Sequence, residues 1–276
     1  MVQKAYSLIF RVSLFLHKLF FFLFNRGYPF GNRIWAKKEK YIKIFEESKK
    51  KNFLIIDEFE KKKSFSINKK WLNNLALKTQ VVIKKTPINY QHGRVIYSEL
   101  MSYIKKRNIK NFNILETGSA RGFSSICLSR ALIDSHVKGK IYSIDILPVK
   151  KKIYWNCISD LEGKKSRKEL LKDWDYELKN INYIQGKSKD IFSKIDLKRI
   201  HFSFLDGSHN FKDVSYEFDW ISKRQIKGDI IIFDDYNSKK FDGVVKCVDN
   251  IRSENIYKLS FIYSENNRYY VIATKK

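Results

Sequence analysis

The sequence predicts an α/β protein built on a doubly wound, Rossmann-like sheet of seven strands, mostly parallel with an antiparallel C-terminal strand. Short, nearly continuous apolar runs alternate with helix-compatible stretches, which is typical of parallel strands covered by helices on both faces. The last two runs are separated only by residues 264–267, and this short polar connection predicts a hairpin. Four runs end in an acid, at Glu116, Asp145, Asp206 and Asp234. Because parallel strands bring their carboxyl ends to one edge of the sheet, these acids predict a ligand site there.

The individual elements follow from apolar spacing. The expected strands cover residues 112–115, 140–145, 181–184, 200–205, 229–233, 257–263 and 268–274. Apolar residues that recur every three or four positions predict helices over 37–51, 71–77 and 124–133, and one more after Gly93. Residues 53–59 are short and apolar and are expected to form a strand, and Lys61 to Lys63 are expected in a solvated loop. The long stretch 147–180, with Trp155 and Trp174, is expected either to cover the strand ends as a substrate lid or to be a solvated insertion.

The chain divides into an N-terminal apolar segment, a helical extension and one large domain. With 276 residues it is long enough for an α/β domain over 86–276, preceded by an extension of unknown role over 31–85. Residues 1–30 combine a strongly apolar run, 5–24, with a connector. Charged residues interrupt that run on one side of a helix, so it is a poor membrane span and a poor signal peptide. An amphipathic helix of this kind fits a membrane interface, a partner or the protein's own core.

The charge and the cysteines set the cellular context. A net charge of +26 suits nucleic acid, an anionic membrane or an acidic substrate, but the lysines are spread along the chain as expected of solvated faces. Cys127, Cys157 and Cys247 are widely spaced and form no C-x-x-C, which indicates neither a zinc site nor a disulfide framework. We expect buried thiols in a reducing compartment. The predicted location is the cytoplasm, with the alternative of peripheral attachment to the membrane.

A glycine-containing turn joins the first strand of the large domain to the next helix. It begins at Glu116 and contains Gly118, Ser119 and Gly122. The two glycines allow a ligand to approach the backbone closely. The spacing matches neither the dinucleotide fingerprint nor a phosphate loop, and the acid would repel a phosphate. The turn therefore suits a ligand without phosphates and with an amine or cationic end.

The later strand ends offer ligands for a cation and a candidate base. Asp206, Asp234 and Asp235 provide carboxylate oxygens, which suit Mg²⁺ rather than zinc. A hard cation lowers the pKa of a bound hydroxyl, and His209 can accept a proton near neutral pH. Adjacent side chains point apart while a strand continues, so Asp234 and Asp235 converge only if the strand ends there.

The order and spacing of these motifs over 86–276 resemble the class I S-adenosylmethionine-dependent methyltransferases. Within them the chain is most similar to the O-methyltransferases of the catechol and caffeoyl-CoA type and to sugar methyltransferases. The resemblance implies that Glu116, Gly118, Ser119 and Gly122 form the first motif around the methionine part of the cofactor. It also implies that Asp145 holds the ribose hydroxyls and that the segment containing Ser188 lies near the adenine.

The same resemblance assigns the later motifs. It implies that Asp206 serves both the cofactor and a divalent cation, and that Asp234 and Asp235 complete the metal site. Asp235 replaces the asparagine usual in the family, which adds a negative charge. His209 stands where catechol-type relatives place the basic residue that deprotonates the substrate.

The predicted function is an S-adenosylmethionine-dependent methyltransferase, and more specifically an O-methyltransferase assisted by a divalent cation such as Mg²⁺. Its acceptor is expected to be the hydroxyl of a small molecule or a glycan, and a homodimer is one expected assembly. Two alternatives stay open: an RNA methyltransferase, which the positive charge suggests, and a non-catalytic cofactor-fold scaffold at a membrane. No amino-group methyltransferase motif and no separate RNA-binding module is evident in the sequence, so nucleic acid is the less favoured partner.

Overall fold

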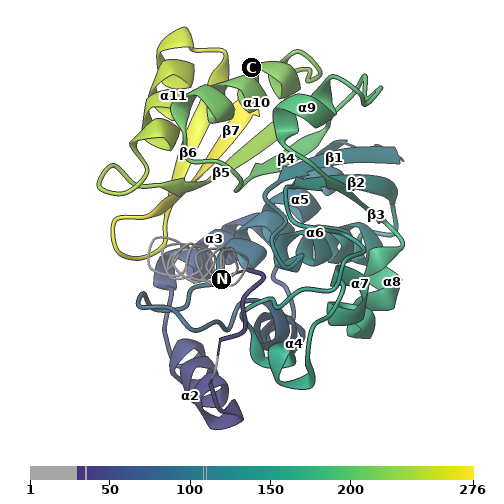
Figure 1. The fold of residues 1–276 in the computed structure, drawn as a ribbon. Coiled ribbons are helices and arrows are strands. Elements are labelled where there is room, and N and C mark those ends of the chain that lie inside the picture. Colours follow the sequence, from purple (N-terminus) through teal and green to yellow (C-terminus); the bar gives the residue numbers. More distant parts are fainter. Residues whose placement is uncertain (1–29, 35, 108, 110) are drawn as a thin grey trace, which may run out of the picture.

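The computed structural model describes residues 30–34, 36–107, 109 and 111–276. The helix expected over residues 5–24 lies outside the described residues. Within them, the strands form one mixed sheet with helices on both faces (Figure 1). This arrangement confirms the predicted Rossmann-like fold class.

The sheet has seven strands in the order β3-β2-β1-β4-β5-β7-β6. The first five are parallel: β1 (Asn111–Thr117), β2 (Lys138–Asp145), β3 (Ile181–Gln185), β4 (Phe202–Leu205) and β5 (Ile230–Tyr236). The last two, β6 (Tyr257–Tyr263) and β7 (Tyr269–Lys275), form the predicted hairpin, and β7 pairs antiparallel with β5. The predicted strands therefore form within a few residues of their expected bounds, and the chain order reverses beside β1, where ligands bind in such sheets.

Helices cover the two faces in separate groups. One face carries α3 (Leu54–Lys63), α4 (Lys69–Thr79), α5 (His92–Arg107) and α6 (Phe123–Asp134), with α2 (Lys38–Lys49) packed beside α4. The other face carries α9 (Ser188–Phe192), α10 (Phe211–Ser222) and α11 (Asp242–Glu254). Alternation along each strand divides the core accordingly, since Ile114 packs on the first group and its neighbour Leu115 on the second.

Two predictions in the N-terminal extension are wrong. Residues 53–59 do not form a strand but belong mostly to α3, whose buried positions Ile56, Phe59 and Glu60 lie on one helical face. Lys61 to Lys63 form the last turn of this helix instead of a loop, and Ser64 ends it in the left-handed conformation with φ 62°. Basic side chains there are favourable, because they face the negative end of the helix dipole.

The extension shares its core with the large domain. Side chains of α3 and α4 join the cluster that also contains residues of α5, α6, β1 and β4. The two tryptophans of the 147–180 stretch are buried as well, with 0% exposure for Trp155 and 6% for Trp174. That stretch forms short helices, η1 (Ile158–Glu162), α7 (Arg167–Leu170), η2 (Lys172–Trp174) and α8 (Asp175–Leu178). The two tryptophans therefore contribute to packing rather than presenting a free surface to a substrate.

All three cysteines are buried and free, as predicted. None of the helices in the described ranges is long and apolar enough to span a membrane.

Candidate active site

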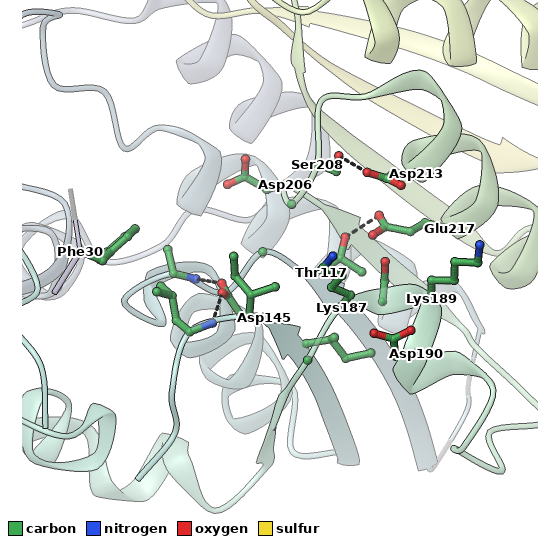
Figure 2. Close-up of a pocket in the computed structure, with 18 residues that line it drawn as sticks. Phe30, Thr117, Asp145, Lys187, Lys189, Asp190, Asp206, Ser208, Asp213 and Glu217 are labelled. Carbon is green, nitrogen blue, oxygen red and sulfur yellow. Dashed lines mark hydrogen bonds between the residues drawn. The ribbon is translucent and has the colours of Figure 1, made fainter. Parts of the chain in front are cut away.

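A cavity of about 690 Å³ opens at the carboxyl ends of β1, β2 and β4, at the edge where the strand-terminal acids were expected (Figure 2). Its walls include four of the residues predicted for ligand binding, Gly118, Asp145, Ser188 and Asp206. Glu116, Ser119 and Gly122 do not line it. The predicted residues therefore separate into those that face the cavity and those that lie behind its wall.

The turn between β1 and α6 forms part of the cavity wall. Gly118 has φ +87°, in the region that favours glycine, and a Cβ there would collide with the backbone carbonyl of Asp206. Gly122 has φ +89° and a Cβ there would press on the Tyr183 hydroxyl and on Leu171. Both glycines are thus required by the backbone path and by close packing, and Gly118 in particular lets the first turn lie directly against the end of β4.

Glu116 stabilises this turn from behind. Its side chain is buried, and one carboxylate oxygen accepts hydrogen bonds from the hydroxyls of Ser125 and Ser143. Burial raises the pKa of Glu116, and the serine hydroxyls partly offset that rise. Ser119, in the same turn, accepts a hydrogen bond from Nη1 of the buried Arg167 at 3.0 Å. The acid and Ser119 thus connect the turn to α6, β2 and α7.

Asp145 closes the end of β2 and is directed into the cavity (Figure 2). Its Oδ2 accepts a hydrogen bond from the backbone N–H of Ala120 at 2.6 Å, and its Oδ1 accepts one from the N–H of Leu147 at 2.8 Å. Each oxygen keeps a second lone pair, so the carboxylate can accept further bonds from a ligand. Backbone donors on both sides fix its orientation.

Three side chains meet where β4 and β5 end. Ligand atoms of Asp206, His209 and Asp235 all lie within 4.8 Å of one another. His209 Nε2 is 2.9 Å from Asp235 Oδ2, and the imidazole stacks on Phe241 with ring centroids 4.0 Å apart. Asp206 belongs to this group and to the cavity wall, so the group borders the cavity.

Asp234 has a different partner from its neighbour. It is buried, and Arg268 binds it in a bidentate manner, through Nε at 3.0 Å and Nη2 at 2.5 Å. Strand β5 does not end at this pair, because it continues to Tyr236 with a register irregularity after Phe233. Asp235 adopts φ +57° within this bulge, which turns its side chain toward His209. Arg268 also reaches Asp235, with Nε 2.8 Å from Oδ1.

The electrostatics of the group reflect an excess of carboxylates. Burial and the charges of Asp234 and Asp235 raise the pKa of Asp206 well above its ordinary value. Burial alone would also raise the pKa of Asp235, but the hydrogen bond with His209 and the charge of Arg268 lower it overall. Arg268 and His209 contact these acids, and Lys84 and His92 also lie within electrostatic range of Asp235.

Comparison with known proteins identifies the domain. Residues 115–236 match the family model of a methyltransferase domain, and this range contains the turn, Asp145 and the acidic group. This part of the chain is similar to a methyltransferase domain. Comparison with curated protein sequences gives no match.

Solved structures show the same fold in methyltransferases. The O-methyltransferase TomG from Streptomyces achromogenes, involved in tomaymycin synthesis and solved in complex with SAM, is 17% identical, with 76% of this chain and 92% of that chain covered and a TM-score of 0.52. The O-methyltransferase from Bacillus cereus in complex with SAH is 14% identical, with 82% and 93% covered and a TM-score of 0.51. The O-methyltransferase NovP is 18% identical, with 70% and 83% covered and a TM-score of 0.52. The resemblance to class I S-adenosylmethionine-dependent methyltransferases predicted from the motifs is confirmed at the level of the fold and the domain.

Sequence reasoning missed two residues of the candidate site, Arg268 and Glu217. Arg268 immediately precedes β7, the strand that pairs with β5, so a hairpin register could have placed it opposite the two acids. Glu217 lies on α10 and its side chain enters the cavity from that helix. Helical spacing alone would have assigned Glu217 to the apolar face with Val214, Phe218 and Ile221, where an acid is a signal for a partner or a ligand.

Proposed function

We propose that this protein is an S-adenosylmethionine-dependent O-methyltransferase that acts on a hydroxyl group of a small molecule or a glycan. The proposal rests on the position of Asp206, which joins the cavity to the group of Asp206, His209 and Asp235. Asp206 belongs both to the cavity wall that contains the glycine turn and Asp145 and to the group with His209 and Asp235. A methyl donor in the cavity and an acceptor at that group would therefore be neighbours. The known structures with SAM or SAH share this fold and support the same cofactor.

The cavity residues bind and orient the donor. Asp145, fixed by Ala120 and Leu147, offers two oxygens to the ribose hydroxyls. Gly118 keeps the backbone of the turn open to the methionine part. In the reaction the acceptor oxygen forms a bond to the methyl carbon while the S–CH₃ bond breaks, which yields the methyl ether, S-adenosylhomocysteine and a proton. The protein contributes mainly position and electrostatics, because the cofactor carries the activated group.

The acceptor side fits a divalent cation, but with a different third ligand from the one that the sequence suggested. Asp206, His209 and Asp235 would hold it, since Asp234 is occupied by Arg268. Two carboxylates and an imidazole are donors that suit Mn²⁺ better than Mg²⁺, and a bound cation would stabilise the charged form of Asp206, whose pKa is raised. Such a cation, when bound, would lower the pKa of the acceptor hydroxyl. We therefore assign His209 to the cation rather than to proton transfer.

The cofactor is tested by calorimetric titration of S-adenosylhomocysteine into the wild-type protein, Asp145→Ala and Asp173→Asn. Asp173 is an exposed acid of η2 outside the cavity and controls for the loss of charge. We expect wild type and Asp173→Asn to bind alike and Asp145→Ala to bind at least about tenfold more weakly, from the loss of charge-assisted bonds. Equal binding by Asp145→Ala would contradict the assignment of this residue, and a wild-type protein that does not bind would contradict the function.

The role of His209 is tested by measuring the affinity of wild type and His209→Gln for Mn²⁺, a paramagnetic probe, alone and in competition with Mg²⁺. If His209 is a ligand, His209→Gln lowers the affinity for Mn²⁺, on the order of tenfold to a hundredfold. If it acts only as a base, the variant keeps the wild-type affinity for Mn²⁺ and loses turnover, and this result would overturn the assignment. Addition of EDTA should abolish methyl transfer and excess Mg²⁺ should restore it.

A further inference from the structure

One acid of the cavity has no role in the site described so far. Glu217 is 3% exposed and its side chain enters the cavity from α10 (Figure 2). Its Oε2 accepts a hydrogen bond from the Thr117 hydroxyl at 2.8 Å. No Lys, Arg or His among the described residues forms an ion pair with it. Glu217 is thus a buried carboxyl group with a hydroxyl partner and a ligand cavity in front of it.

The carboxyl group of Glu217 has acceptor positions that a ligand in the cavity could fill with hydrogen-bond donors. A carboxylate has about four acceptor positions, and a buried one is costly unless these are filled. Burial raises the pKa of Glu217 to about 7, although the hydroxyls of Ser188 and Thr117 favour the charged form. A ligand that donates a hydrogen bond to this carboxyl would lower its pKa and gain affinity.

The position of Glu217 selects the part of the ligand that it meets. It lies between Thr117, at the end of β1, and Ser188, at the start of α9. Ser188 belongs to the segment that the resemblance places near the adenine, whereas the methyl group must lie at the other end, beside Asp206. Glu217 therefore faces the base of the nucleoside and not the reacting centre. This step rests on the proposed function, since it requires S-adenosylmethionine in the cavity.

We propose that Glu217 is the specificity residue for the adenine base and that its carboxylate accepts a hydrogen bond from the exocyclic amino group. Adenine presents a donor at this position. A 6-oxopurine such as hypoxanthine presents an acceptor there instead, and two acceptors facing each other leave both unpaired in a buried site. A site built to hydrogen-bond one group rejects the analogue that lacks it far more strongly than a merely apolar pocket does.

The test compares S-adenosylhomocysteine with S-inosylhomocysteine, whose base carries an oxo group in place of the amino group and an N–H at N1 in place of an acceptor. Both are titrated calorimetrically at pH 8 into wild type, Glu217→Gln and Asp219→Asn. Asp219 lies on the same helix but is exposed and outside the cavity, so it controls for the loss of one charge. Glutamine keeps the shape of the side chain and an oxygen for Thr117, and its amide can donate to the 6-oxo group.

We expect wild type and Asp219→Asn to prefer the adenine compound by at least about 100-fold. Glu217→Gln should reduce this preference at least about tenfold, because it binds the adenine compound less tightly and the hypoxanthine compound more tightly. Circular dichroism confirms that each variant is folded. An unchanged preference in Glu217→Gln would overturn the proposal for this residue alone, whereas a wild type that binds neither compound would overturn the proposed function.

Affinity for S-adenosylhomocysteine as a function of pH gives a second readout. It should rise from pH 6 to pH 8 in wild type and Asp219→Asn as Glu217 loses its proton, and this rise should be smaller in Glu217→Gln. The comparison with Gln isolates Glu217 from the other charged groups that line the cavity, which are Asp145, Lys187, Lys189, Asp190, Asp206 and Asp213. Identical pH profiles in wild type and Glu217→Gln would contradict the proposed bond.

Discussion

Replacement of Glu217 by glutamine also has a predicted effect on stability without any ligand. The substitution keeps the volume of the side chain and the hydrogen bond from Thr117, and replaces the ionisable carboxyl with a neutral amide. The pKa of Glu217 is raised from 4.5 to about 7 by burial. In the unfolded chain it returns to its ordinary value, so the folded protein binds the proton more tightly than the unfolded chain does.

The sign and size of the effect follow from this difference. Below pH 4.5 both states are protonated and Glu217 contributes no pH dependence. As pH rises from there to about 7, the unfolded chain loses the proton first, so the free energy of unfolding falls. Each pKa unit corresponds to about 1.4 kcal/mol, which gives about 3 kcal/mol in total and about 2.5 kcal/mol between pH 5 and pH 8. Glu217→Gln does not ionise, so its free energy of unfolding does not fall in this way as the pH rises.

Urea denaturation of wild type, Glu217→Gln and Asp219→Asn at pH 5, 6, 7 and 8 measures the effect. Other buried acids, such as Glu116 and Asp206, also give the wild type a pH dependence, but they are common to all three proteins and cancel in the differences. Relative to wild type, Glu217→Gln should gain about 2.5 kcal/mol of stability between pH 5 and pH 8, while Asp219→Asn stays parallel to wild type. If the difference between Glu217→Gln and wild type stays constant within about 0.5 kcal/mol, the raised pKa is refuted.

Two further substitutions test the frame of the site. Gly118→Ala should abolish binding of S-adenosylhomocysteine and destabilise the protein by more than about 2 kcal/mol, because the added Cβ would collide with the backbone of Asp206. The control is Gly163→Ala, because Gly163 also has a positive φ, +98°, but has open space around it. In the same melting and binding assays it should show only the smaller cost of holding an alanine at positive φ. Arg268→Gln should lower the free energy of unfolding, measured by urea denaturation, by about 3–5 kcal/mol, because it leaves the Asp234 carboxyl buried without its arginine partner. The double variant Arg268→Gln/Asp234→Asn should recover part of that loss. A loss below about 1 kcal/mol in Arg268→Gln would show that the two residues are not coupled as described.

The sheet could be predicted because its signals are local. Residues 257–263 and the neighbouring apolar run are separated by a short polar turn, and the buried parallel strands consist of residues with strong strand preference. The N-terminal extension was harder. Residues 53–59 are dense in apolar side chains without a clear period over so short a window, and α3 becomes recognisable only when it extends through the three lysines to Ser64.

The site was partly predictable for the same reason. Gly118, Asp145, Ser188 and Asp206 stand at strand ends or at the turns that follow them, so chain order alone brings them to the cavity. Glu116 shows where this reasoning stops. Its place at the strand end is correct, but the direction of its side chain depends on the serines of α6 and β2 that surround it, and these cannot be assigned before the helix is docked.

The pair Asp234 and Asp235 was not predictable from local sequence, because its geometry is set by a partner strand. Two adjacent acids diverge in a regular strand, and the bulge in β5 where it pairs with β7 is what gives each its own partner. The same pairing brings Arg268, at the edge of β7, onto both carboxylates. The family resemblance places an asparagine where Asp235 stands, and the extra negative charge of Asp235 would be costly beside the buried Asp234 without compensation. Arg268 supplies that compensation, and beside the cavity the side chains of Asp206, His209 and Asp235 lie within 4.8 Å of one another. The acid that replaces the family's asparagine therefore lies beside Arg268 and His209, and Asp234 pairs with Arg268.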